Sequence, residues 1–137
     1  MNYNLQRFME AQERDYKTAL SEIKAGRKRS HWMWYIFPQI QGLGYSDTSR
    51  YYAIKNIQEA EAYLHHPILG KRLMEICEEL IKLQSSNPTQ VFGTPDDMKL
   101  RSSITLFASV PGAGKVFQMV LDKFFQGLKD HKTVAML

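Results

Sequence analysis

Apolar residues recur at intervals of three and four along most of this chain, which is the pattern of helices that bury one face. The clearest run lies at residues 69–83, where leucine and isoleucine form a long apolar stripe between glutamates and lysines. Comparable runs occupy residues 5–25, 57–64, 94–109 and 116–124. No segment alternates apolar and polar residues between hairpin turns, so strands are not expected. The sequence therefore predicts an all-α fold, a compact orthogonal multi-helical bundle of about six to eight short helices.

Length and composition are typical of a globular domain. The 137 residues suit one helical domain over 1–137, and the hydrophobic fraction of 44% is ordinary for such a domain. No uncharged apolar run approaches the roughly 18–20 residues of a membrane helix, and the N-terminus lacks the apolar core of a signal peptide. Cys77 is the single cysteine, so no internal disulfide can form. We therefore expect a cytoplasmic protein without membrane association.

Capping residues predict where several helices begin and end. A side-chain oxygen before a helix can accept hydrogen bonds from the free amides of its first turn. The candidate N-caps are Ser46 (or Asp47), Asn56, Thr94 with Pro95 as the first helical residue, and Asp130. Gly26 is expected to stop the first helix, and Asp15 would cap a second piece if the segment 5–25 is divided. Residues 84–88 are interpreted as a polar linker.

The segment His31–Gln39 holds both tryptophans and two further aromatic residues, the highest density of rings in the chain. Ser30 can cap a short helix that starts at His31, and Pro38 would end it by disfavouring the helical conformation of the preceding residue. A strand with alternating faces is the alternative, although the helical pattern elsewhere favours the helix. Such rings usually fill a core, but one face could also line a cleft.

Polar residues in two apolar segments suggest a ligand site. A tryptophan offers a flat surface for a planar ring, Gln39 offers a donor and an acceptor, and His31 can transfer a proton near neutral pH. Lys99 with two serines one turn on could hold an anion, although an exposed polar face would look the same. Asp97 suits binding better than proton abstraction, because the helix dipole stabilises its charged form. The predicted ligand-binding residues are His31, Trp32, Trp34, Gln39, Ser46, Asp97, Lys99, Ser102 and Ser103.

A net charge of +4 allows an anionic partner without requiring one. Basic residues are densest at residues 24–29, directly before the aromatic segment. Beside exposed rings, this basic segment could contact nucleic acid or a phosphate-bearing ligand, and otherwise it is a solvated helix end. Acidic residues number 14 against 18 basic ones and are interspersed with them, so nucleic acid is the weaker of the two partners.

Three motif-like segments lack the residues that their chemistry needs. Gly42-Leu43-Gly44 has Asp47 where the dinucleotide fingerprint requires a glycine, and residues 109–116 lack the first glycine and the final serine or threonine of a P-loop. His65 and His66 are adjacent rather than one helical turn apart and have no evident carboxylate partner. We therefore predict no metal site and no cofactor, and the catalytic residues of any enzyme function stay undefined.

The chain resembles a family of small bacterial proteins of unknown function, domain of unknown function 1810, which are often mislabelled calpastatin. The resemblance covers nearly the whole chain and is most specific from His31 to Gln39. The matching residues are Arg7-Phe8, Ala11-Gln12, Gly26, His31–Trp34, Phe37–Gln39, Gly42–Gly44, Ser46, Ser49, Tyr52–Ile54, Glu59-Ala60, Tyr63-Leu64, His66-Pro67, Leu69-Gly70, Arg72-Leu73, Phe92-Gly93, Asp97, Lys99-Leu100, Ser102-Ser103 and Thr105–Phe107. Membership implies a mainly helical fold and no particular reaction. The density of apolar residues does not fit a disordered calpain inhibitor.

Three functions follow as hypotheses. The first is a pocket for a nucleotide or sugar phosphate, in a binding protein or a hydrolase. A looser likeness of residues 97–127 to helical N-glycosidases acting on riboflavin precursors or ADP-ribose is similar in texture only and assigns no residue a role. The second hypothesis is a helical module that binds nucleic acid through Arg27, Lys28 and Arg29. The third is a protein-interaction or assembly domain, whose oligomeric state the sequence does not define.

Overall fold

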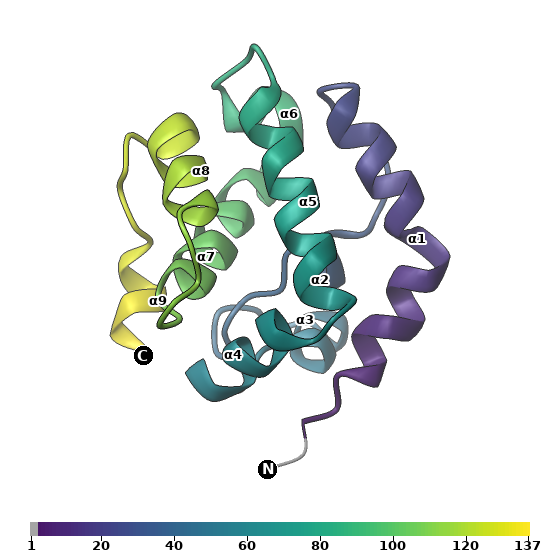
Figure 1. Ribbon diagram of the computed structural model, residues 1–137, viewed down its shortest axis with the longest axis vertical. Coiled ribbons are helices and arrows are strands. Elements are labelled where there is room, and N and C mark those ends of the chain that lie inside the picture. Colours follow the sequence, from purple (N-terminus) through teal and green to yellow (C-terminus); the bar gives the residue numbers. More distant parts are fainter. Residues whose placement is uncertain (1–2) are drawn as a thin grey trace.

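Helices make up the regular structure of residues 3–137, the part of the chain that the computed structural model describes, apart from one isolated bridge (Figure 1). The helices of this part are α1 (Gln6–Lys24), α2 (Met33–Ile36), α3 (Asp47–Tyr52), α4 (Ile57–His65), α5 (Leu69–Lys82), α6 (Pro88–Phe92), α7 (Asp96–Ala108), α8 (Val116–Phe125) and α9 (His131–Ala135). The predicted all-α class is confirmed. The described residues hold nine helices rather than six to eight, because α2, α6 and α9 have only four or five residues each. None of these helices combines the length and apolar character that crossing a membrane requires.

Helices α5 and α7 form the centre of the bundle. Helix α5 packs against α1, α4 and α8, and lies between α1 and α8 in Figure 1, while α7 packs against α4, α6, α8 and α9. The predicted stripe of α5 is buried, since Leu69, Leu73, Ile76 and Leu80 are at most 1% exposed. Each such side chain stabilises the fold by about 1.5–3 kcal/mol. Cys77 lies beside the stripe, where burial raises the pKa of its thiol and keeps it unreactive.

Gly70 allows α4 and α5 to cross closely. A Cβ atom at this position would lie 2.0 Å from the carbonyl oxygen of Leu64, which is far inside van der Waals contact. Because the obstructing atom belongs to the backbone, no side-chain rotation could relieve the contact. A glycine is therefore required where α5 begins.

Three of the predicted N-caps are confirmed. The side chains of Ser46, Asn56 and Asp130 each accept a hydrogen bond, 2.9 to 3.1 Å long, from the backbone N–H three residues on. Helix α1 ends before Gly26, which has a positive φ of 81°, as expected. The segment is one continuous helix, so Asp15 does not cap a second piece, and its carboxylate instead accepts a hydrogen bond from the Tyr35 hydroxyl.

The predicted start of the aromatic helix is wrong. Helix α2 begins at Met33, with Trp32 at its N-cap, rather than at His31 after Ser30. Ser30 does not cap it, because it lies three residues before Met33, and its hydroxyl donates instead to the Glu22 carboxylate. The helix ends before Pro38 as predicted, and the strand alternative is wrong.

Glu22 fixes the connection between α1 and α2. Its carboxylate accepts hydrogen bonds from the backbone amides of Arg29 (2.7 Å) and Ser30 (2.9 Å), and from the Trp32 indole (2.9 Å). Burial raises the pKa of Glu22, but these hydrogen bonds and that of the Ser30 hydroxyl outweigh it and hold the pKa at about 2. The carboxylate is therefore charged at neutral pH and orders the turn.

The region before α7 differs from the prediction by a few residues. Helix α7 begins at Asp96 rather than Pro95, and the Thr94 hydroxyl donates to the Asp97 carboxylate (3.3 Å) instead of capping the helix. The predicted linker ends in a single-turn helix, α6, that Asn87 caps.

Candidate functional site

A loop closed by one pair of backbone contacts carries the candidate site. The amide of Ile54 donates to the carbonyl of Gln39, and the amide of Gln41 donates to the carbonyl of Ile54, each at 2.8 Å. This is the isolated parallel bridge between Ile40 and Ile54, whose side chains are at most 3% exposed. Residues 41–53, which include α3, therefore form a loop that is anchored in the core at both ends.

A buried ion pair holds the backbone at the C-terminal end of this loop. The Arg7 guanidinium lies 3.1 Å from the Glu59 carboxylate, and the two side chains are 5% and 0% exposed. Arg7 also donates to the carbonyls of Tyr51 (2.8 Å) and Ala53 (2.9 Å), at the end of α3. Glu59 accepts from the backbone amide of Lys55 (2.7 Å). The pair therefore fixes the backbone on both sides of Ala53.

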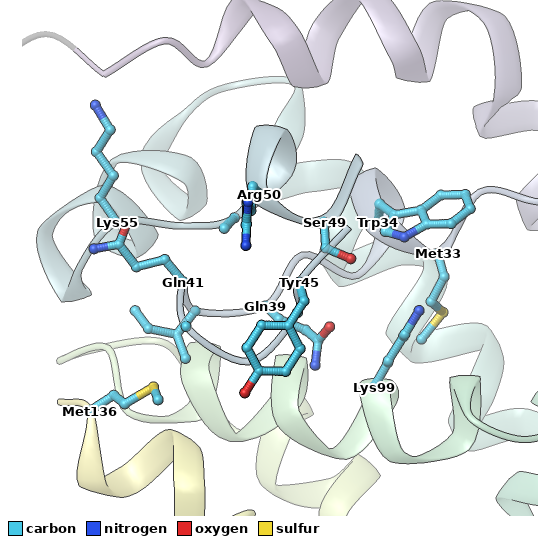
Figure 2. A pocket seen from close by; sticks show the side chains of 14 residues that line it. Met33, Trp34, Gln39, Gln41, Tyr45, Ser49, Arg50, Lys55, Lys99 and Met136 are labelled. Carbon is cyan, nitrogen blue, oxygen red and sulfur yellow. The ribbon is translucent and has the colours of Figure 1, made fainter. Parts of the chain in front are cut away.

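The closed loop lines a pocket of about 610 Å³. This volume is in the range of small-molecule sites, roughly 300–1,000 Å³. Figure 2 shows Trp34, Met33 and Lys99 together at one end and Lys55 and Gln41 at the other. The lining residues come from α2, the loop, α3, α7 and the end of the chain: Met33, Trp34, Gln39, Ile40, Gln41, Gly42, Gly44, Tyr45, Ser49, Arg50, Ala53, Lys55, Lys99 and Met136.

The charges at the pocket have one sign. Arg50, Lys55 and Lys99 line it, and no aspartate or glutamate is among its lining residues, all of which belong to the described part of the chain. The Lys99 ammonium lies 5.4 Å from the ring centre of Trp34 and 3.7 Å from a carboxylate oxygen of Asp96. That ion pair is long, and Asp96 makes a closer one, 2.8 Å, with Lys28. The contact with Lys99 is therefore the longer of the two ion pairs of Asp96.

Two glycines shape the loop wall. A Cβ atom at Gly44 would lie 2.5 Å from the Cβ of Ser49, so the loop approaches α3 too closely for a side chain. Gly42 has a φ of 98° and lies against the end of the Met136 side chain. Two glycines two residues apart favour a turn with a positive φ or a close backbone approach, and this geometry agrees with that pattern.

The structure brings three of the predicted site residues together at this pocket, namely Trp34, Gln39 and Lys99. His31 lies instead at a separate, more open hollow of about 460 Å³, of which Trp34 is also a wall. Ser46 lines neither hollow, and its hydroxyl caps α3 and bonds the Ser49 hydroxyl at 2.9 Å.

The other predicted site residues are buried and do not line this pocket, although Ser102 lines a neighbouring cavity together with Gln39 and Lys99. Trp32 is 1% exposed and donates to Glu22. Asp97 accepts from the hydroxyls of Thr89 and Thr94, and Ser102 donates to a backbone carbonyl of its own helix. Ser103 is fully buried, and its hydroxyl has no hydrogen-bond partner. Lys99 and the two serines therefore do not form a shared anion grip at this pocket.

Sequence reasoning missed five polar side chains that line the pocket: Gln41, Tyr45, Ser49, Arg50 and Lys55. All five lie on or beside the closed loop. The glycine pair signalled the turn that brings them there, but the bridge that closes the loop joins residues fourteen positions apart and has no sequence signature.

The nucleic-acid hypothesis expects the basic segment before α2 to lie beside exposed rings. The side chains of residues 27–29 are arranged differently. Lys28 has a side chain only 8% exposed, because its ammonium pairs with Asp96 and lies 5.0 Å from the ring centre of Trp32. Trp32 is itself buried, so Arg27 and Arg29 are exposed without this ring beside them.

The fold and the site together define an all-α protein with a basic pocket built on a closed loop. The chain belongs to the family described as protein of unknown function (DUF1810), whose model matches residues 2–137. It is similar to the conserved hypothetical protein Rv1873 from Mycobacterium tuberculosis, whose crystal structure superposes with a TM-score of 0.96 at 44% identity, covering 98% of this chain and 96% of that one. A search of curated proteins found no match.

Proposed function

We propose that this protein binds a small anionic ligand of the nucleotide or sugar-phosphate class in the pocket that the closed loop lines. The observation that carries the proposal is the charge of the lining: Arg50, Lys55 and Lys99 without a carboxylate among them. An arginine can hold a phosphate with two parallel hydrogen bonds, and lysine adds a mobile point charge. A pocket that was only a packing defect would have no reason to gather three cations.

The uncharged lining residues favour a ligand with a planar ring. Trp34 is partly exposed at one end of the pocket, and Tyr45, which is 80% exposed, lies between the two ends in Figure 2. Gln39 and Gln41 supply amide donors and acceptors that suit the polar edge of a base or the hydroxyls of a sugar. Trp34 and Lys55 lie at opposite ends of the pocket, which matches a ligand whose ring and phosphate are separated (Figure 2).

The lining favours binding over hydrolysis. General acid–base catalysis most often uses histidine, aspartate or glutamate, and none of these is among the pocket's lining residues within the described chain. His31 lies at the neighbouring hollow, and Asp97 is buried in hydrogen bonds to two threonines. We therefore propose a binding role and assign no catalytic residue.

Titration of the protein with adenosine diphosphate, ribose phosphate and unphosphorylated adenosine tests the proposal. A phosphate-bearing ligand at 100 times its Kd should raise the free energy of unfolding by about 2.7 kcal/mol. Adenosine alone should give a smaller effect. The chain has two tryptophans, and Trp34 lines the pocket while Trp32 is buried, so a fluorescence change on binding should disappear in Trp34→Phe.

The matched variants are Arg50→Gln in the pocket and Lys17→Gln on the exposed side of α1. Both remove one positive charge, so a general charge effect would change binding equally. We expect Arg50→Gln to weaken binding about tenfold, as for one charge-assisted hydrogen bond, and Lys17→Gln to leave it unchanged. Equal effects of the two variants, or no stabilisation by either phosphate compound, would refute the proposal.

A further inference from the structure

A second cavity adjoins the first. It has a volume of about 400 Å³ and shares Gln39, Gly44 and Lys99 with the first pocket. Its other walls come from α7 and from the start of α9, and include Arg101 and Lys132. Because the two hollows share three lining residues, they are neighbouring halves of one surface rather than unrelated sites.

The second cavity is also basic. Arg101, His131 and Lys132 line it together with Lys99, and its single acidic lining residue is Asp130. One oxygen of the Asp130 carboxylate, Oδ2, caps α9, where it accepts from the amide and the hydroxyl of Thr133 at 3.0 and 2.6 Å. The Arg101 guanidinium is held in place by two backbone carbonyls, at 2.8 and 3.0 Å. The second cavity thus has the guanidinium of Arg101 in a fixed position, together with the side chains of Lys99 and Lys132.

Each cavity combines cations with an apolar surface. In the first, Trp34 and Met33 lie beside Lys99, and in the second, Leu43, Pro95 and Met98 lie beside Arg101 and Lys132. Met98 is 52% exposed, so its side chain offers apolar surface to a ligand in the second cavity. A simple phosphate or polyphosphate would not need the second apolar surface. A nucleotide unit, with a base and a phosphate, would use both kinds of surface.

We infer that the ligand is a dinucleotide that spans both cavities, with one nucleotide unit in each. This inference rests on the proposed function and adds the class of ligand. Lys99 lines both cavities, so its ammonium can reach the phosphates that join the two units. Its long contact with Asp96, 3.7 Å, leaves it available for that role. One base stacks near Trp34, and the other covers Met98.

The experiment compares three probes by calorimetric titration of the full chain. These are adenosine monophosphate, two adenosine monophosphates joined through a diphosphate, and two joined through a phosphodiester with a terminal phosphate. The last two distinguish a free dinucleotide from a fragment of single-stranded nucleic acid. Lys132→Gln and Met98→Ser change only the second cavity, Arg50→Gln changes only the first, and Lys17→Gln is the charge control.

We expect at least one dinucleotide to bind about tenfold or more tightly than the mononucleotide, since it gains the charge-assisted contacts of the second cavity. Lys132→Gln and Met98→Ser should weaken only dinucleotide binding, whereas Arg50→Gln should weaken every probe. Equal affinities for mononucleotide and dinucleotides, with no effect of Lys132→Gln, would overturn the inference and leave the proposed pocket intact. Absence of binding by all three probes would overturn both.

Discussion

Replacing Arg7 with methionine should lower the free energy of unfolding by about 3–5 kcal/mol, the usual cost of breaking a buried ion pair from one side. Methionine fills much of the same volume, so the loss is mainly electrostatic. It leaves the Glu59 carboxylate, 0% exposed, with the Lys55 amide as its remaining hydrogen-bond donor. It also removes the donors to the carbonyls of Tyr51 and Ala53. Against a total stability of about 5–15 kcal/mol, this is a large fraction.

The reverse change, Glu59→Gln, should cost less, about 1–3 kcal/mol. The Arg7 guanidinium would keep the backbone carbonyls of Asn4, Tyr51 and Ala53 as acceptors, so its charge would stay solvated by the protein. In the double variant no charge is left buried. It should therefore be more stable than Arg7→Met alone, and the order of the three stabilities follows from the geometry.

Urea unfolding followed by circular dichroism measures these differences. The control is Lys82→Met, which breaks an exposed ion pair with Glu79 in which the lysine side chain is 69% exposed. Such pairs contribute about 0–1 kcal/mol, so the control should be nearly neutral. The reasoning fails if Arg7→Met costs no more than Lys82→Met, or if the double variant is less stable than Arg7→Met.

Four other substitutions have outcomes that the structure sets. Glu22→Gln should flatten the acid dependence of stability: the folded pKa of about 2 lies below the ordinary 4.5, so the wild-type protein loses stability as the pH falls from 4.5 to 2. That loss, measured by urea unfolding at each pH, should be about 1–2 kcal/mol after solvent screening, and a variant with the same acid profile as the wild type would contradict it. Ser103→Ala removes a buried hydroxyl that has no partner, so it should be neutral or stabilise by up to about 1 kcal/mol, whereas Ser102→Ala loses a hydrogen bond and should destabilise. Gly70→Ala should lower the melting temperature although alanine favours helices by about 1 kcal/mol, and a higher melting temperature would exclude the close crossing of α4 and α5.

Local signals in the sequence predicted the helices well. The caps at Ser46, Asn56 and Asp130 and the apolar stripe of α5 depend on residues within one or two turns of each other, so their effect can be read from spacing alone. The prediction failed at Ser30, because the helix begins three residues later and the Ser30 amide and hydroxyl donate instead to the Glu22 carboxylate, eight residues earlier. Single-turn helices such as α6 depend on tertiary packing and have no periodic pattern to recognise.

The candidate site was predictable only in part, for the same reason. Trp34, Gln39 and Lys99 could be proposed from their chemistry, and they meet at one pocket because α2 and α7 approach across the loop. Spacing alone could not show that Ser103 is buried, since α7 is enclosed on several sides by α4, α6, α8 and α9. No local signal marked Arg50, because the bridge that closes its loop beside the pocket is a long-range contact.

The position of the Arg7 and Glu59 pair implies that the pocket can be weakened without touching its lining. Neither residue lines the cavity, yet both hold the backbone that carries Arg50 and Lys55. The double variant Arg7→Met with Glu59→Gln should regain stability relative to Arg7→Met, because no buried charge remains. It should still bind a phosphate ligand less tightly than Glu59→Gln alone, because the carbonyls at the end of α3 have lost their donor. Calorimetric titration beside urea unfolding separates the two effects. If ligand affinity recovers together with stability in the double variant, the Arg7 guanidinium stabilises the fold but does not position the pocket residues.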